Sequence, residues 1–243
     1  MNRRRVAGVL SALLGLILSA LPALAAEPVG PDRPSAAKSP AMVHFSAQGD
    51  EFNLPAPMGL CPPSAAYQDK IQQMSALLEK TRMVLGAALF PCEPTSISSR
   101  TPIALVVGMA NLPEKVPGSR GAFVRQASNL LRTQTGQLQM QSGLEQVAAL
   151  EKNATGDVTK ISAKPTVVDE DEYAVYVFSN VQVTTGVVQK AGIAMEGLTI
   201  AKGRVILIVF IARPGSIDDA KSLLALAKLE TKRFIDANED LQG

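Results

Sequence analysis

The chain has 243 residues, of which 47% are hydrophobic, enough for a sizeable core, and it contains no tryptophan and only 4% aromatic residues. We therefore expect a core of Val, Ile, Leu, Ala and Met. Its formal net charge is +2, but residues 1–25 hold three arginines and no acid, which leaves 21 basic against 22 acidic side chains, a net of −1. A nucleic-acid-binding surface needs a basic excess, so this balance argues against one.

The N-terminus has the pattern of a secretory signal peptide. Residues 3–5 are arginines, residues 6–21 are uncharged and almost wholly apolar, and Pro22 precedes Ala-Leu-Ala at 23–25. This order of a positive region, an apolar run and a small-residue site predicts Sec export with cleavage after Ala25. The alternative is an uncleaved anchor, for which the apolar run is short. We expect a periplasmic or secreted protein that meets the membrane only transiently, through its signal peptide.

Two further segments follow the predicted signal peptide. Residues 26–41 contain four prolines and almost no large apolar side chain, so they bury too little surface to offset their chain entropy and are predicted to form a disordered tether. Residues 42–243 suit one domain.

The first ordered elements are a hairpin and a helix. Two short runs within residues 42–55 flank Gln48-Gly49-Asp50, which predicts a hairpin. Ser64 is placed to cap a helix. The apolar stripe of that helix has helical spacing: Tyr67, Ile71, Met74 and Leu78.

The two cysteines decide how that helix ends. Residues 83–90 are apolar throughout, as in a covered strand or a continuing helix. A helix over 64–89 would be about 39 Å long and would keep Cys61 and Cys92 apart. A helix ending near Lys80, at about 25 Å, and a returning strand of about 26 Å bring them together. An exported chain with two cysteines is expected to pair them. A redox or metal pair is the alternative, but there is no C-x-x-C.

The middle of the chain continues with a strand and helical sequence. Residues 101–110 predict a second covered strand. Ser119 is placed to cap a helix whose apolar side chains include Phe123 and Ala127. After Gly143 the helix either continues or is followed by a short second one, and residues 153–168 suit a loop or weak edge strand.

The last third predicts strands and a closing helix. Residues 172–185 are rich in β-branched and aromatic side chains, and residues 186–214 predict two or three strands with a tight turn at Lys202-Gly203. Ser216 is expected to cap the final helix, with acidic side chains in its first turn. The resulting class is α+β, with a mostly antiparallel sheet and helices on both faces, an α/β/α sandwich.

This element order resembles the PsbP-like fold, shared by photosystem accessory proteins and bacterial periplasmic proteins of the DcrB kind. The stretch "FNLPAPMG" is similar to the F-x-x-P-x-G-W entry of that family, although Leu60 stands where an aromatic residue is frequent. The closing "GLTIAKGRVILIVFIA" strand pair before a C-terminal helix is similar too. The resemblance covers 42–239 loosely and implies an accessory or binding role, without transferring a catalytic residue.

Motifs for catalysis or cofactor binding are not evident. The sequence has neither a P-loop nor a dinucleotide fingerprint, so we expect no cofactor. The acidic run at 169–172 lacks EF-hand spacing, so we interpret it as a solvated turn and expect no metal site. We expect an exported accessory or binding protein without catalytic activity. The alternative is an unrecognised hydrolase-type enzyme whose serine or carboxylates meet only in three dimensions.

One loop is a candidate for binding. Helix N-termini attract anions, and Ser119 opens a helix next to Lys115, Arg120 and Arg125. The loop is long for a simple connection. These residues predict a site for a small anionic ligand or a protein partner, while solvated surface charges are the alternative interpretation.

Overall fold

The structure is a computed structural model that describes residues 42–92, 102–155, 159–185 and 188–239. The predicted signal peptide and tether, residues 1–41, lie outside the described residues. None of the helices in the described ranges combines the length and apolar character that a membrane crossing requires.

Nine strands and five helical segments make up the described chain. The strands are β1 (Met42–Ala47), β2 (Asp50–Pro55), β3 (Leu60–Cys61), β4 (Met83–Pro91), β5 (Ala104–Ala110), β6 (Thr159–Glu170), β7 (Val175–Thr185), β8 (Val188–Ala201) and β9 (Arg204–Ala212). The helices are the short 3-10 helix η1 (Ala65–Tyr67), then α2 (Gln68–Lys80), α3 (Arg120–Leu131), α4 (Gln134–Thr155) and α5 (Ile217–Asn238).

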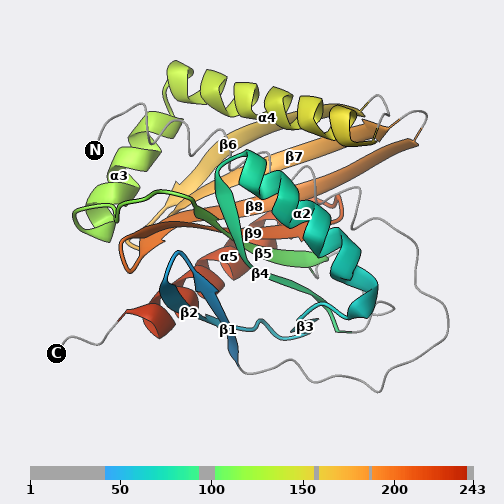
Figure 1. The fold of residues 1–243 in the computed structure, drawn as a ribbon. Helices are drawn as coiled ribbons and strands as arrows, with labels where there is room; N and C mark the ends of the chain where they lie inside the picture. Colours follow the sequence, from blue (N-terminus) through green and yellow to red (C-terminus); the bar gives the residue numbers. More distant parts are fainter. Residues whose placement is uncertain (1–41, 93–101, 156–158, 186–187, 240–243) are drawn as a thin grey trace.

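Seven strands form one sheet in the order β3-β4-β5-β9-β8-β7-β6, and every neighbouring pair is antiparallel. β1 and β2 form a separate hairpin (Figure 1). The expected α+β class with an antiparallel sheet is therefore confirmed. Of the two or three strands expected in 186–214, the structure has two, β8 and β9.

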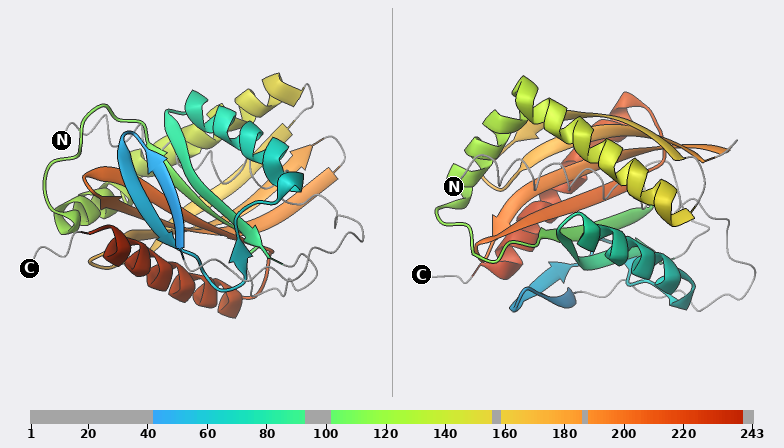
Figure 2. Two further views of the ribbon diagram at one scale, coloured as in Figure 1. Left: turned by 60° about the horizontal axis from the view of Figure 1, so that its bottom comes forward. Right: turned by 45° about the horizontal axis from the view of Figure 1, so that its top comes forward.

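Apolar side chains cover both faces of the central strands. In β9, Val205 and Leu207 pack with residues of α2, α3 and α4, whereas Ile206 and Ile208 pack with the hairpin and α5. Figure 2 shows α2 and α4 on one side of the sheet, and the hairpin and α5 on the other. This explains why the strand is apolar at successive positions, since each parity faces its own core.

The helix-to-strand reversal deduced from the cysteines is present. α2 ends at Lys80 and β4 begins at Met83, with Arg82 at a φ of 60°. Cys61 and Cys92 form a disulfide with an S–S length of 2.06 Å and Cα atoms 5.0 Å apart. The bond joins β3 to the end of β4 and closes a loop that contains α2.

Two of the three expected helix caps form. The Ser119 hydroxyl accepts a hydrogen bond from the Ala122 amide at 3.3 Å, and Ser216 makes a capping box with Asp219. The cap expected of Ser64 is wrong. Ser64 precedes η1, but its side chain makes no capping hydrogen bond, because the first turn is a 3-10 turn closed by Tyr67 N donating to Ser64 O.

The break between the middle helices lies earlier than Gly143. The chain turns between α3 and α4 at residues 132–133, where the Thr133 hydroxyl accepts from the Gly136 amide at 3.0 Å. A Cβ on Gly136 would stand 2.1 Å from the Leu130 carbonyl oxygen, so this tight turn requires glycine. α4 then runs unbroken to Thr155, and β6 is a full edge strand rather than a weak one.

Candidate functional site

The residues expected to bind an anion or a partner lie at one end of the seven-stranded sheet. The β6–β7 turn at 171–174, the β8–β9 turn at 202–203 and the loop after β5 at 111–119 meet there, as the strand registers require. We call this the Gly203 end. The β1–β2 turn is fastened to it, because Lys115 and Arg204 both bond Asp50.

Lys115 and Ser119 are both used within the chain. Lys115 Nζ lies 2.8 Å from Asp50 Oδ1, and its aliphatic stem lies against Gly203. Ser119 caps α3, so the Ala122 amide is already bonded to its hydroxyl. The sequence predicted that an anion would bind the free amides at the start of α3. One of these amides, that of Ala122, is already hydrogen-bonded within the chain.

Arg120 and Arg125 are on α3 but have different surroundings. Arg120 forms an ion pair with Glu239, at the end of α5, and its guanidinium carbon lies 5.6 Å from the centre of the Tyr173 ring. Burial is the main influence on Arg120 and lowers the pKa of its guanidinium. Arg125 is exposed, and its guanidinium lies over Gly121.

The four residues thus share one end of the molecule, but Lys115 and Arg120 point to different carboxylates. Anion binding here stays a prediction that a phosphate titration, followed through backbone amide shifts, tests. If amides 120–123 of α3 shift no more than the rest of the chain at millimolar phosphate, the prediction fails.

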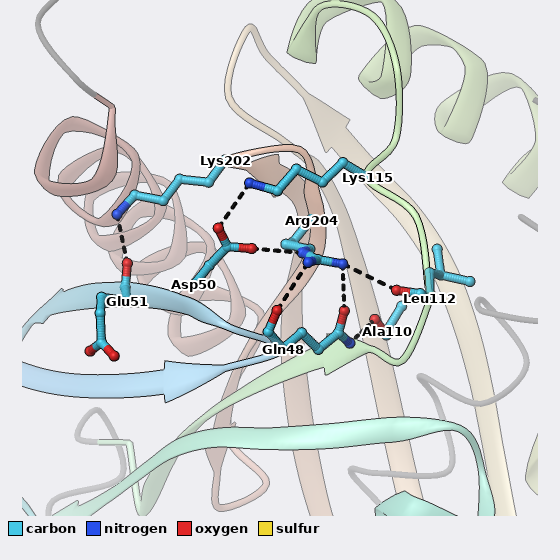
Figure 3. A network of polar contacts seen from close by, with 8 residues as sticks. All are labelled: Gln48, Asp50, Glu51, Ala110, Leu112, Lys115, Lys202 and Arg204. Carbon is cyan, nitrogen blue, oxygen red and sulfur yellow. Dashed lines mark hydrogen bonds and ion pairs between the residues drawn. The ribbon is translucent and has the colours of Figure 1, made fainter.

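Arg204, the first residue of β9, is the centre of the polar network at this end (Figure 3). Its Nε donates to Asp50 Oδ2 at 2.8 Å, and Nη2 donates to the Gln48 carbonyl oxygen at 3.0 Å. Nη1 donates to Gln48 Oε1 at 2.9 Å and to the Leu112 carbonyl oxygen at 3.1 Å. Gln48 in turn donates from Nε2 to the Ala110 carbonyl oxygen at 2.6 Å. One side chain therefore ties the hairpin turn to the loop after β5.

Two tight turns, one between β1 and β2 and one between β8 and β9, bring the residues of this network together. Gln48 and Gly49 have φ values of 54° and 79°, and Lys202 and Gly203 have 49° and 76°. Positive φ at both central residues is the geometry that joins antiparallel strands in two-residue turns. The two turns are themselves linked, because Lys202 Nζ donates to the Glu51 carbonyl oxygen at 2.6 Å.

The electrostatics favour a structural role for the network. The hydrogen bond from Lys115, and after it that from Arg204, lowers the pKa of the Asp50 carboxyl. The Arg204 side chain is 11% exposed and that of Asp50 is 17% exposed, so the pair is largely shielded from water. Sequence reasoning missed Arg204, because its partners are more than 90 residues away along the chain and a single arginine beside a turn carries no signal of its own.

The acidic run at 169–172 is less solvated than expected. Lys228 of α5 lies 2.9 Å from Asp169 and 3.8 Å from Asp171, and the hydrogen bond from Lys228 lowers the pKa of Asp169. Glu170 accepts a hydrogen bond from the Ser128 hydroxyl of α3. Three of the four carboxylates thus fasten helices to the sheet. Within the described ranges, no group of three or more His, Cys, Asp or Glu side chains is placed to hold a metal.

A buried carboxyl group was also missed. Glu196 lies in β8 and is 3% exposed, and the hydroxyl of the fully buried Ser179 in β7 donates to its Oε1 at 3.1 Å. Burial raises the pKa of Glu196 to about 8, and the Ser179 hydrogen bond opposes that rise. The available signal was a lone acid inside the apolar stretch "GIAMEGLTIA". A serine beside a carboxyl could suggest chemistry, but both are closed to a substrate in this structure.

The fold and these contacts define an α+β protein with a seven-stranded antiparallel sheet. No family model and no curated protein matches the sequence. Among solved structures, it matches the solution structure of cyanobacterial PsbP (CyanoP) from Synechocystis sp. PCC 6803 at 14% sequence identity and a TM-score of 0.30, over 84% of this chain and 96% of that chain. The resemblance to PsbP-like proteins thus has a structural match, from which we draw nothing about function.

Proposed function

We propose that this protein is exported and acts in the periplasm or outside the cell as an accessory or binding protein without catalytic activity. The proposal of export rests on the Cys61–Cys92 disulfide. Disulfides persist in oxidising compartments and are rare in the cytosol. The signal-peptide pattern of residues 1–25 agrees with this assignment.

The binding role rests on how the Gly203 end is built. The turns and loops at this end are held by Arg204, Lys115 and Lys228 through hydrogen bonds and ion pairs that reach the hairpin and α5. Loops that a sheet holds in fixed positions are where proteins commonly place binding residues. Asp50 is paired with Lys115 and Arg204, and Asp169 and Asp171 are paired with Lys228. These pairings support a fixed recognition surface rather than a catalytic centre.

Export is tested by expressing the full chain and fractionating the cells. We expect the protein in the periplasmic or secreted fraction, beginning at Ala26 within a residue or two, because the small-residue site precedes it. N-terminal sequencing measures this. Thiol titration of the denatured, unreduced protein should find no free thiol.

The double variant Cys61→Ser, Cys92→Ser is the matched control. It should be exported and cleaved at the same residue, but be less stable by about 3–4 kcal/mol, since a loop of about 30 residues is no longer closed. Protein that keeps Met1 in the membrane fraction, or that presents two reactive thiols, would contradict the proposal.

A further inference from the structure

The methionines of the described chain differ sharply in their exposure to water. Met58 is 96% exposed, and Met42 follows at 37%. The others are at most 6% exposed: Met74, Met83, Met109, Met140 and Met195. The burial of these five follows from their packing in the two cores on either side of the sheet. Met58 instead stands in solvent between Pro57 and Gly59.

The exposure of Met58 is imposed by a turn. The Leu60 amide donates to the Pro57 carbonyl oxygen at 3.1 Å, which closes a four-residue turn with Met58 as its second residue. Gly59, the third residue, has a φ of 84°, where a side chain would be strained, and no atom lies near the position of its missing Cβ. The turn therefore points Met58 away from the domain.

The same turn is anchored without the Met58 side chain. The Cys92 amide donates to the Gly59 carbonyl oxygen at 2.9 Å, and the Cys61–Cys92 disulfide follows directly. Leu60 is 1% exposed and pairs with Pro91 across β3 and β4. Because these contacts come from the backbone and from neighbouring residues, a polar group on Met58 would not disturb them.

We propose that Met58 is a reversible oxidation site of this protein. With hydrogen peroxide, the thioether sulfur attacks one peroxide oxygen, the S–O bond forms as the O–O bond breaks, and the second oxygen leaves as water. Sulfur is oxidised to the sulfoxide and peroxide is reduced. A methionine sulfoxide reductase with a pair of thiols reverses the step, as the sulfoxide oxygen leaves as water and the thiols become a disulfide.

The test is a peroxide time course on the purified protein, followed by peptide mass spectrometry. The peptide containing Met58 should gain one oxygen first, at a rate near that of free methionine and at least ~10-fold faster than any buried methionine. The melting temperature should not change at this stage. Methionine sulfoxide reductases A and B should together return the folded, singly oxidised protein to its original mass.

Met58→Leu and Met42→Leu are the matched variants. Met58→Leu should lose the fast event, and Met42→Leu should keep it, while both unfold like the wild type. The proposal is overturned if Met58 reacts no faster than Met42 or the buried methionines. It is equally overturned if the first oxidation lowers the melting temperature, or if the reductases leave the folded, oxidised protein unchanged.

Discussion

Replacing Arg204 by methionine is expected to lower the free energy of unfolding by about 2–3 kcal/mol. The loss arises because Asp50 and Gln48 remain in a largely shielded site without the guanidinium that bonds both. Methionine keeps most of the apolar stem, so the change isolates the polar contacts. Denaturant unfolding measures the difference, and the slope with denaturant should be unchanged.

Lys115→Met is the matched control, because Lys115 bonds the same carboxylate but is 53% exposed. Exposed ion pairs contribute at most about 1 kcal/mol, so we expect a small loss. Amide hydrogen exchange should show that the hairpin amides of β1 and β2 exchange faster in Arg204→Met than in Lys115→Met. Equal stability losses in the two variants would refute a central role for Arg204.

Glu196→Gln is expected to make the protein more stable than the wild type above pH 8. The pKa of Glu196 is about 8 in the folded protein and near 4.5 in the unfolded chain. Between these values the folded state holds a proton that the unfolded state has released, so stability falls as pH rises. Each unit of pKa difference corresponds to about 1.4 kcal/mol, so this one group contributes several kcal/mol to the loss.

The pH dependence that Glu196 gives to stability is opposite in direction to that of a salt-bridged acid, whose stabilisation is lost as pH falls. The stabilisation from Glu196 is fully present below pH 4.5, declines through neutral pH and is gone above pH 8. Glutamine does not ionise, so the difference between the variant and the wild type should grow with pH over that window. Unfolding curves at pH 5, 7 and 9 measure it.

Glu230→Gln is the comparison for that experiment. Burial also raises the pKa of Glu230, but Arg233, which bonds both of its carboxylate oxygens at 2.9 Å, lowers it. Removing this charge leaves Arg233 without its partner, so Glu230→Gln should not gain stability at high pH. If Glu196→Gln shows the same pH profile as the wild type, Glu196 does not ionise within the folded protein in this range.

Local signals made much of the fold predictable. Ser119 and Ser216 are helix caps, and Lys202-Gly203 is a tight turn, because each depends on residues only a few positions apart. The disulfide was predictable as well, because only a helix followed by a returning strand brings Cys61 and Cys92 within bonding distance.

The failures have physical reasons too. β3 has two residues and exists through its pairing with β4, so it carries no pattern of its own. β6 is an edge strand whose exposure alternates from Ser162 to Glu170, but Pro165 within the run argues against a strand when the sequence is interpreted alone. The turn before α4 depends on the approach of Gly136 to the Leu130 carbonyl, which no spacing rule contains.

The sequence by itself determined the α+β class, the antiparallel closing strands and the pairing of Cys61 with Cys92, since periodicity, turn residues and chain length act locally. The tertiary structure decided the polar contacts. Arg204 meets Asp50 from 154 positions away, and Ser179 meets Glu196 through the register of β7 with β8. Such contacts depend on which strands become neighbours, and that is set by burial over the whole chain rather than by any one segment.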